Sequence, residues 1–266
     1  MAIHTIKKDA MEYLVAERIA VPHAFTTRLG GVSTGHLAGL NLGLHRGDRP
    51  ANVAENYARL AKTIGFDGEK LVLAHQVHGD AVRVVTEADC LGLDHQLYPE
   101  CDGLITNTAG VTLVVFTADC TPILLHDPVT GAVGAVHAGW RGTALDIAGK
   151  TVQKMVETFG CDPAQIRTAI GPNIGACCFQ TDGDVPAAMV KTYGVAAEEA
   201  IRVAGDKFYV NLKTINALAL RRAGVVHLEI STACTMCSPD RFWSHRYTGG
   251  LRGSQGALIL CQGGLP

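Results

Sequence analysis

Three apolar runs follow one another in the middle of the chain and constrain its fold more than any other feature. They cover Thr112–Phe116, Pro122–Leu125 and Ala132–Val136, and none contains a charged side chain. Short runs without polar alternation are typical of strands that are buried on both faces. The segment Asp127–Gly131, which contains Pro128, predicts a hairpin turn between the last two runs. A sheet covered on both sides is therefore expected at the centre of the fold.

Further strands and helices are predicted around these runs. The additional strands are Leu71–Ala74 and Ala81–Val85, which flank a turn at Gly79–Asp80, and the later runs Val225–Ile230 and Ala257–Leu260. Helical spacing of apolar residues predicts helices over Val53–Ile64, Leu145–Phe159, Val185–Tyr193 and Leu212–Ala219, the last with Asn211 as its N-cap. The sequence shows no internal repeat and no low-complexity segment. These elements predict one α+β domain over residues 1–266, a layered domain with mixed β-sheets flanked by helices.

Charge and cysteine content narrow the class of protein. The net charge of -2 gives no electrostatic reason to expect nucleic acid as a partner. No apolar run approaches the length of a membrane span, and no segment resembles a signal peptide, so we expect no membrane association and a cytoplasmic location. The nine cysteines are then expected to be reduced thiols. Several of them are interpreted as small core or surface residues: Cys90, Cys101, Cys161 and Cys261.

Two histidines and one cysteine stand at the ends of apolar runs. His78, Cys120 and His137 together offer two imidazoles and a thiolate, a donor set that suits zinc. Three protein ligands from distant segments leave one tetrahedral position open, which is typical of catalytic zinc and not of a structural site. Each residue also has a simpler interpretation, as a core or surface histidine or an inert buried thiol. Their separations match no local zinc motif.

Several blocks of the sequence resemble one known family. The central blocks are His75–Gly79, Phe116–Pro122, His137–Gly142 and Ile170–Cys178. Agreeing blocks near the two ends are Thr27–Ser33, Leu40–Gly43, Gly47–Asp48, Glu55–Asn56, Cys234–Thr235, Phe242–Arg246 and Leu251–Gly253. In this order they resemble the multicopper polyphenol oxidase (laccase-like) family, also described as purine nucleoside phosphorylases and as the peptidoglycan-editing factor. The resemblance runs from about Thr27 to the end of the chain.

The resemblance implies an activity and a cofactor. It implies that His78, Cys120 and His137 bind zinc, and that the substrates are purine nucleosides and phosphate. The expected reaction is phosphorolysis of adenosine, inosine and 5′-methylthioadenosine, with adenosine deamination as a second activity. Zinc with an open position can lower the pKa of bound water to about 7, which suits deamination. Copper could occupy the same nitrogen and sulfur ligands.

Phosphorolysis also requires groups that hold phosphate and the nucleoside. Arg141 and Arg246 are candidates for phosphate, because a planar guanidinium suits that anion. Arg28 and Asn41 are candidates for binding ribose or phosphate, and His245 for donating a proton to the leaving base. Ordinary surface arginines and a structural imidazole remain the alternatives.

Two rival functions stay open at this stage. Copper oxidases bind copper through paired His-x-His repeats, and none of the eleven histidines of this chain forms such a repeat. A cysteine hydrolase would use Cys120 as nucleophile and His137 as its base, which fits an amidase editing peptidoglycan precursors. Metal content discriminates between these functions and the zinc phosphorylase.

A possible zinc-binding motif occurs near the C-terminus. His227 and Glu229 followed by Cys234 and Cys237 superficially resemble the two halves of a zinc nucleobase deaminase. The halves are nearly contiguous, and His227 falls in a strand pattern where the deaminase fold begins a helix. We therefore reject that interpretation. The adjacent pair Cys177 and Cys178 is interpreted as packing, because neighbouring residues are poorly suited to bind one metal.

Overall fold

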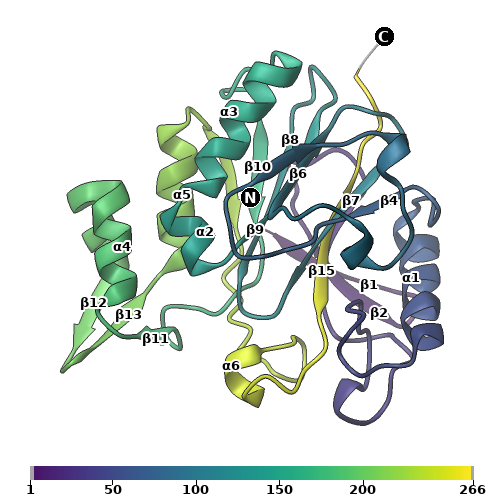
Figure 1. Ribbon diagram of the computed structural model, residues 1–266, viewed down its shortest axis with the longest axis horizontal. Coiled ribbons are helices and arrows are strands. Elements are labelled where there is room, and N and C mark those ends of the chain that lie inside the picture. The colour runs from purple at the N-terminus through teal and green to yellow at the C-terminus, as the bar shows by residue number, and fades with distance from the viewer. Residues whose placement is uncertain (1–2, 265–266) are drawn as a thin grey trace.

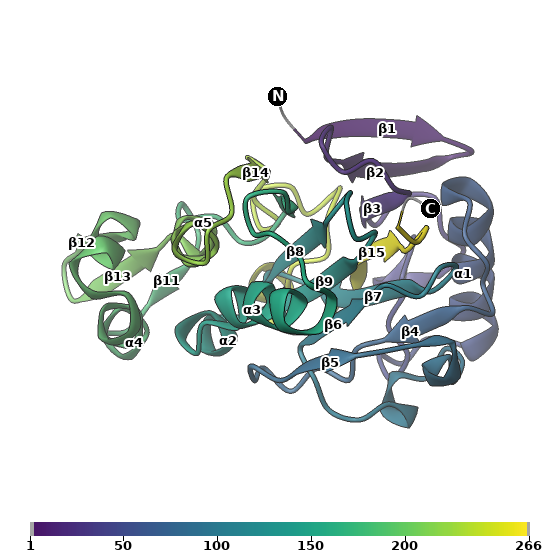
Figure 2. The same ribbon diagram turned by 90° about the horizontal axis from the view of Figure 1, so that it is seen from above.

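Two six-stranded sheets lie face to face in the computed structural model, which describes residues 3–264 (Figures 1 and 2). The first sheet has the order β1 (His4–Lys8), β2 (Met11–Val15), β3 (His23–Thr26), β15 (Gln255–Leu260), β7 (Thr112–Thr117) and β4 (Leu71–Leu73). The second has the order β14 (His227–Ile230), β10 (Arg167–Ile170), β8 (Thr121–His126), β9 (Val133–Ala138), β6 (Gly103–Thr106) and β5 (Val82–Val84). Parallel and antiparallel pairs occur in both sheets, so the predicted α+β fold with mixed sheets is confirmed.

Helices cover the outer faces of the two sheets. α1 (Pro50–Ile64) lies beside the first sheet, and α2 (Trp140–Ala144), α3 (Ile147–Phe159) and α5 (Leu212–Arg222) lie over the second (Figures 1 and 2). α4 (Asp184–Tyr193) packs near a small sheet of order β11 (Gln180–Thr181), β13 (Lys207–Val210) and β12 (Ile201–Ala204). The short helix α6 (His245–Thr248) precedes β15. Within residues 3–264, no helix is long and apolar enough to cross a membrane.

The central strands are apolar on both faces because each face meets a different core. Leu124 and Ala135 belong to the core between the two sheets. Ile123, Leu125 and Val136 belong to the core between the second sheet and the helices α3 and α5. Full burial of one such large side chain stabilises the fold by about 1.5–3 kcal/mol. The uninterrupted apolar runs of the sequence thus reflect strands in the interior of a four-layer structure.

Two local predictions need correction. The hairpin between β8 and β9 is present, but the strands around Gly79–Asp80 do not pair with each other: β4 joins the first sheet and β5 the second. The helix predicted from Leu145 begins instead at Ile147, because Asp146 adopts a left-handed conformation and caps the new helix by accepting from Gly149 N–H. Leu145 itself is exposed.

The sequence analysis also missed several strands, most of them short or charged. β1 is an edge strand that carries Lys7 and Lys8 and is largely exposed, so it lacks an apolar signal. β6 and β10 have only four residues each, too few for a clear pattern. Their positions are decided by the neighbouring strands with which they pair.

Candidate metal centre

His78, Cys120 and His137 meet where the chain crosses from one sheet to the other. His78 lies on the loop from β4 to β5, Cys120 lies between β7 and β8, and His137 is on β9. Their potential ligand atoms all lie within 4.8 Å of one another. His78 adopts a left-handed φ of 61°, and Asp119, next to Cys120, has a φ of 88°. Such conformations are unfavourable for non-glycine residues and often occur at functional sites.

One carboxylate, Asp102, positions two of the three side chains. Its Oδ1 accepts a hydrogen bond of 2.7 Å from His137 Nδ1, which leaves the Nε2 of His137 available as a ligand atom. The same carboxylate accepts from the backbone N–H groups of Val77, His78 and Gly79, at 2.8–3.1 Å. Asp102 lies just before β6 and is fully buried. A carboxylate behind a histidine is the usual outer partner of a metal ligand, so this donor set fits a metal ion.

The absence of a side chain at Gly139 leaves room for His78 and Cys120. A Cβ atom at this position would lie 2.6 Å from His78 Nδ1 and 3.3 Å from Cys120 Sγ. Its backbone is in an ordinary extended conformation as the N-cap of α2, with φ of -66°. Glycine is required here by the close approach of His78 and not by backbone geometry.

The charges of Cys120 and His137 depend on each other. Burial alone would raise the pKa of Cys120, but His137 and His78 lower it to about 6. Burial alone would lower the pKa of His137, but the Cys120 thiolate and Asp102 raise it to about 9. Between these values the pair is a thiolate beside an imidazolium. A thiolate at neutral pH is the form that binds a metal or attacks an electrophile.

The three side chains face a pocket that also contains two arginines. The pocket is lined by His78, Cys120 and His137 together with Gly43, Leu44, Arg46, Ala74, Gln76, His95, Phe116, Thr117, Ala118, Arg252 and Ser254. Arg252 Nη1 donates to Ser254 Oγ at 2.9 Å, while its buried Nε has no hydrogen-bond partner within residues 3–264. Burial and the neighbouring Arg46 lower the pKa of Arg252 to about 10, so it remains a cation at neutral pH. An unpaired buried donor beside a second cation suits an anionic ligand.

Another wall of the pocket is aromatic. The rings of His95 and Phe116 are tilted, with centroids 5.9 Å apart. Gln76 holds the backbone of Phe116 by accepting from its N–H at 2.6 Å and donating to its carbonyl oxygen at 2.8 Å. This wall offers flat apolar surface for a heterocycle.

Four other residues expected at the site are placed outside the lining of this pocket. Arg28 stacks on Trp243 and donates to Pro239 O and Ala38 O. Asn41 is buried and bridges Gly43, Asp48 and Ser254, and thereby supports the pocket wall from behind. The Arg141 side chain is exposed over Trp140. The guanidinium of Arg246 donates to Gln180 O.

His245, the first residue of α6, is exposed and also lies outside the pocket lining. Burial and the nearby Arg252 lower its pKa, whereas Asp119 opposes this shift. The neutral imidazole is therefore favoured at neutral pH, which suits accepting a proton better than donating one.

Sequence reasoning missed Asp102, Arg46 and Arg252 as site residues. Arg252 falls in the block Leu251–Gly253 that carried part of the family resemblance, so that block held a usable signal. Arg46 directly precedes the Gly47–Asp48 block, whereas Asp102 lies in a segment with no recognisable motif. Only the packing of the two sheets brings them to the pocket.

Comparison with known proteins identifies the family of this chain. The fold and the His-Cys-His pocket describe an α+β protein with a potential catalytic metal centre. The family described as multi-copper polyphenol oxidoreductase laccase matches residues 22–262, and the chain belongs to this family. A relative from Deinococcus radiodurans, named purine nucleoside phosphorylase, is 42% identical over 253 residues, which cover 95% of this chain and 92% of the relative. The purine nucleoside phosphorylase YlmD of Geobacillus stearothermophilus is 40% identical and covers 88% of each chain.

Solved structures share the complete fold. The crystal structure of YlmD from Geobacillus stearothermophilus superimposes with a TM-score of 0.92 at 36% identity, covering 98% of this chain and 99% of that one. The Bacillus licheniformis protein YfiH gives a TM-score of 0.90 at 33% identity, covering 96% and 97%. The two-sheet architecture that forms the pocket is thus common to these proteins.

Proposed function

We propose that this protein is a zinc-dependent purine nucleoside phosphorylase that acts on adenosine, inosine and 5′-methylthioadenosine and also deaminates adenosine. The observation that carries the proposal is one pocket containing His78, Cys120 and His137 together with Arg252 and its unpaired Nε. The names of the relatives support the reaction class.

The donor set of the pocket fits zinc. His78, Cys120 and His137 would hold the ion, with Asp102 orienting His137. When bound, zinc would supply a Lewis acid and activate a water molecule at its open position. The same nitrogen and sulfur ligands also accept copper, so elemental analysis of the purified protein is part of the test.

The arginines would hold the phosphate that attacks the nucleoside. Arg252 offers its free Nε–H, Ser254 a hydroxyl, and Arg46 a second positive charge at the pocket. In phosphorolysis a phosphate oxygen bonds to the anomeric carbon while the bond from that carbon to the purine nitrogen breaks. The electron pair stays on the purine, which leaves with a proton. Holding phosphate beside the sugar makes this step effectively intramolecular.

The purine would lie against the aromatic wall. His95 and Phe116 provide the flat surface, and Gln76 fixes the backbone of Phe116. His245 could exchange a proton with the leaving base. Arg28, Asn41, Arg141 and Arg246 retain their predicted roles only as weaker proposals, because their side chains are engaged elsewhere or lie outside the pocket lining.

Product analysis tests this function directly. Purified protein is incubated with adenosine, with and without phosphate, and the products are separated by chromatography. We expect adenine and ribose 1-phosphate only when phosphate is present, and inosine in both reactions. Cys120→Asp should keep some metal and activity, because a carboxylate can bind zinc, whereas Cys120→Ala should lose both. Absence of free base in zinc-replete protein with phosphate contradicts the proposal.

A cysteine hydrolase is the second candidate, favoured by one specific observation. Asp102, His137 and Cys120 lie in the order that a carboxylate, a base and a nucleophile require. His78, packed against His137 with ring centroids 4.8 Å apart, has no role in that arrangement but completes a metal site. Retained activity in protein verified to contain no metal, together with fast alkylation of Cys120, would favour the hydrolase.

A further inference from the structure

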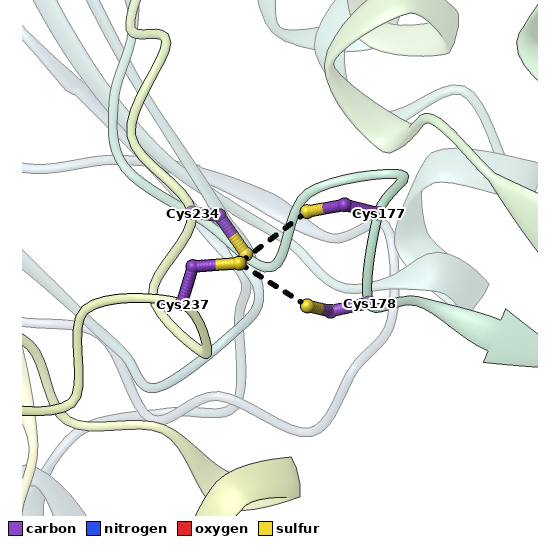
Figure 3. A group of neighbouring side chains, drawn as sticks. All are labelled: Cys177, Cys178, Cys234 and Cys237. Carbon is purple, nitrogen blue, oxygen red and sulfur yellow. Dashed lines mark hydrogen bonds between the residues drawn. The ribbon is translucent and has the colours of Figure 1, made fainter.

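Four cysteines form a cluster apart from the pocket (Figure 3). Cys177 and Cys178 lie on the turn after β10, and Cys234 and Cys237 on the turn after β14. Their sulfur atoms all lie within 4.8 Å of one another, and Figure 3 shows the two pairs pointing toward each other. All four are free thiols. The interpretation of Cys177 and Cys178 as packing residues does not account for this convergence.

The spacing of the sulfur atoms fits a shared metal ion. Cys237 Sγ lies 3.6 Å from Cys177 Sγ and 3.4 Å from Cys178 Sγ. A tetrahedral ion with metal–sulfur bonds of about 2.3 Å places its sulfur ligands roughly 3.8 Å apart. A disulfide bond requires about 2.05 Å. These sulfur–sulfur distances are therefore close to those of four thiolates around one tetrahedral ion.

The backbone holds the thiols in this arrangement. The turn of the first pair is closed by Cys178 N–H and Phe179 N–H, which both donate to Gly175 O at 2.9 Å. Gly175 N–H in turn donates to Cys234 Sγ at 3.1 Å, and an N–H donor of this kind stabilises a thiolate. A Cβ on Gly175 would lie 3.2 Å from both Cys177 Sγ and Cys234 Cβ, so the first turn packs closely against the second at this glycine. The tight turn explains how two adjacent cysteines can face one point.

Exposure argues against a packing role. Cys177 and Cys237 are exposed, whereas thiols that serve packing are usually buried. Lys213 is buried nearby and donates to Ala233 O, next to Cys234, at 2.6 Å. Its positive charge partly balances the negative charge that four thiolates leave on a divalent ion.

The cluster is connected to the pocket through Asp119. Thr235, between the second pair of cysteines, donates to Asp119 Oδ1 at 2.6 Å, and Arg246 N–H donates to Asp119 Oδ2 at 2.6 Å. Asp119 precedes Cys120. An ion in the cluster would therefore fix the segment that leads to α6 against the loop that carries Cys120.

We propose that Cys177, Cys178, Cys234 and Cys237 bind one zinc ion in a closed, structural site, separate from the ion expected in the pocket. Four sulfur ligands in a tetrahedron are typical of structural zinc. The site needs no substrate and does not depend on the proposed phosphorolysis.

Metal counting on the intact protein tests the proposal. Wild-type protein purified in reductant with zinc should contain two zinc ions per chain, and thiol titration after chelation in denaturant should count all nine cysteines as free thiols. Cys237→Ser should retain one ion, His137→Ala should retain the other, and the control Cys90→Ser, at a partly exposed cysteine outside both clusters, should retain two. Cobalt substitution should give the strong visible absorption of a thiolate-bound ion in His137→Ala and lose most of it in Cys237→Ser.

Two results would overturn the proposal. Wild-type protein with a single zinc that Cys237→Ser leaves in place would show that the cluster binds none. An intact mass lower by two hydrogens under non-reducing conditions, with Cys237 mapped to Cys177 or Cys178, would identify a disulfide instead. If Cys237→Ser fails to fold, His137→Ala decides the question, because absence of zinc from this variant would show that the cluster binds none.

Discussion

The pocket and the cysteine cluster use similar donors but are built differently. The pocket takes His78, Cys120 and His137 from three separate segments at the crossing of two sheets, and these side chains face a cavity. The cluster takes its four thiols from two tight turns, and the four sulfur atoms face one another. Three ligands leave a coordination position for a reactant, whereas four do not. If the pocket holds a catalytic ion and the cluster a structural one, as proposed, then the number and origin of the ligands, more than their chemistry, separate the two kinds of site.

The largest effect is expected for Gly139→Ala. The new Cβ would overlap His78 Nδ1, so His78 must leave its position although the backbone tolerates alanine. We expect phosphorolysis to fall about 100-fold or more, because a displacement of about 1 Å in a catalytic group can have that effect. Zinc in the pocket should be lost while zinc in the cluster stays. Gly68→Ala, where an added Cβ meets nothing within 4 Å, is the control and should behave like the wild type.

Asp102→Asn should have the next largest effect. The amide cannot serve both His137 and the three backbone N–H groups, so two ligands lose their orientation. Zinc affinity of the pocket should fall about 10- to 100-fold, measured by competition with a chelating dye. The exposed Asp182→Asn serves as control. An equal loss of metal from both sites would mean that Asp102 supports the whole fold and not the pocket alone.

Arg252→Lys should change phosphate binding more than the chemical step. Lysine keeps the charge but loses the Nε–H that has no hydrogen-bond partner among residues 3–264. Loss of one hydrogen bond to a charged ligand, about 1.5 kcal/mol, corresponds to a rise in the KM for phosphate of about 10-fold. Steady-state kinetics at varied phosphate measure this, with Arg221→Lys on the exposed face of α5 as control. An unchanged KM would remove Arg252 from the phosphate site.

The smallest effect concerns the pH dependence of alkylation at Cys120 in protein freed of metal. The folded-state pKa of about 6 lies below the ordinary value, so the thiolate persists above pH 6 and is lost as the pH falls through that value. Labelling of the Cys120 peptide, followed by mass spectrometry, should have its midpoint near 6 and shift upward in His137→Ala. Cys101 should stay unlabelled, because burial raises its pKa to about 11. A midpoint above 8 in the wild type would contradict the thiolate–imidazolium pair.

Much of the fold could be predicted because its centre has a strong local signal. The apolar runs of β7, β8 and β9 and the stripe of α3 are visible in the sequence. The partners of β4 and β5 could not be predicted, since the loop between them crosses from one sheet to the other and leaves no trace in composition. Edge strands such as β1 carry charges and are defined by pairing alone.

The candidate site likewise contains residues that the sequence predicts and residues that it does not. His78, Cys120 and His137 could be proposed from their chemistry and their blocks, and the structure brings them together. Asp102 could not, and the sequence blocks near Arg46 and Arg252 do not single these arginines out, because an ordinary carboxylate or guanidinium shows its role only through the groups around it. The predicted phosphate role of Arg141 and Arg246 rests on residue type and position in the sequence, neither of which determines where a side chain points.

By itself, the sequence determined the buried strands, the main helices, the family and the three residues most suited to hold a metal. Each of these depends on residue type and short-range pattern. The tertiary structure decided which carboxylate supports the histidines, which arginines reach the pocket, and that Cys177 and Cys178 meet Cys234 and Cys237. The physical reason is that hydrogen bonds and metal coordination need atoms within a few ångströms. For segments far apart in the chain, only the packing of the two sheets creates that proximity.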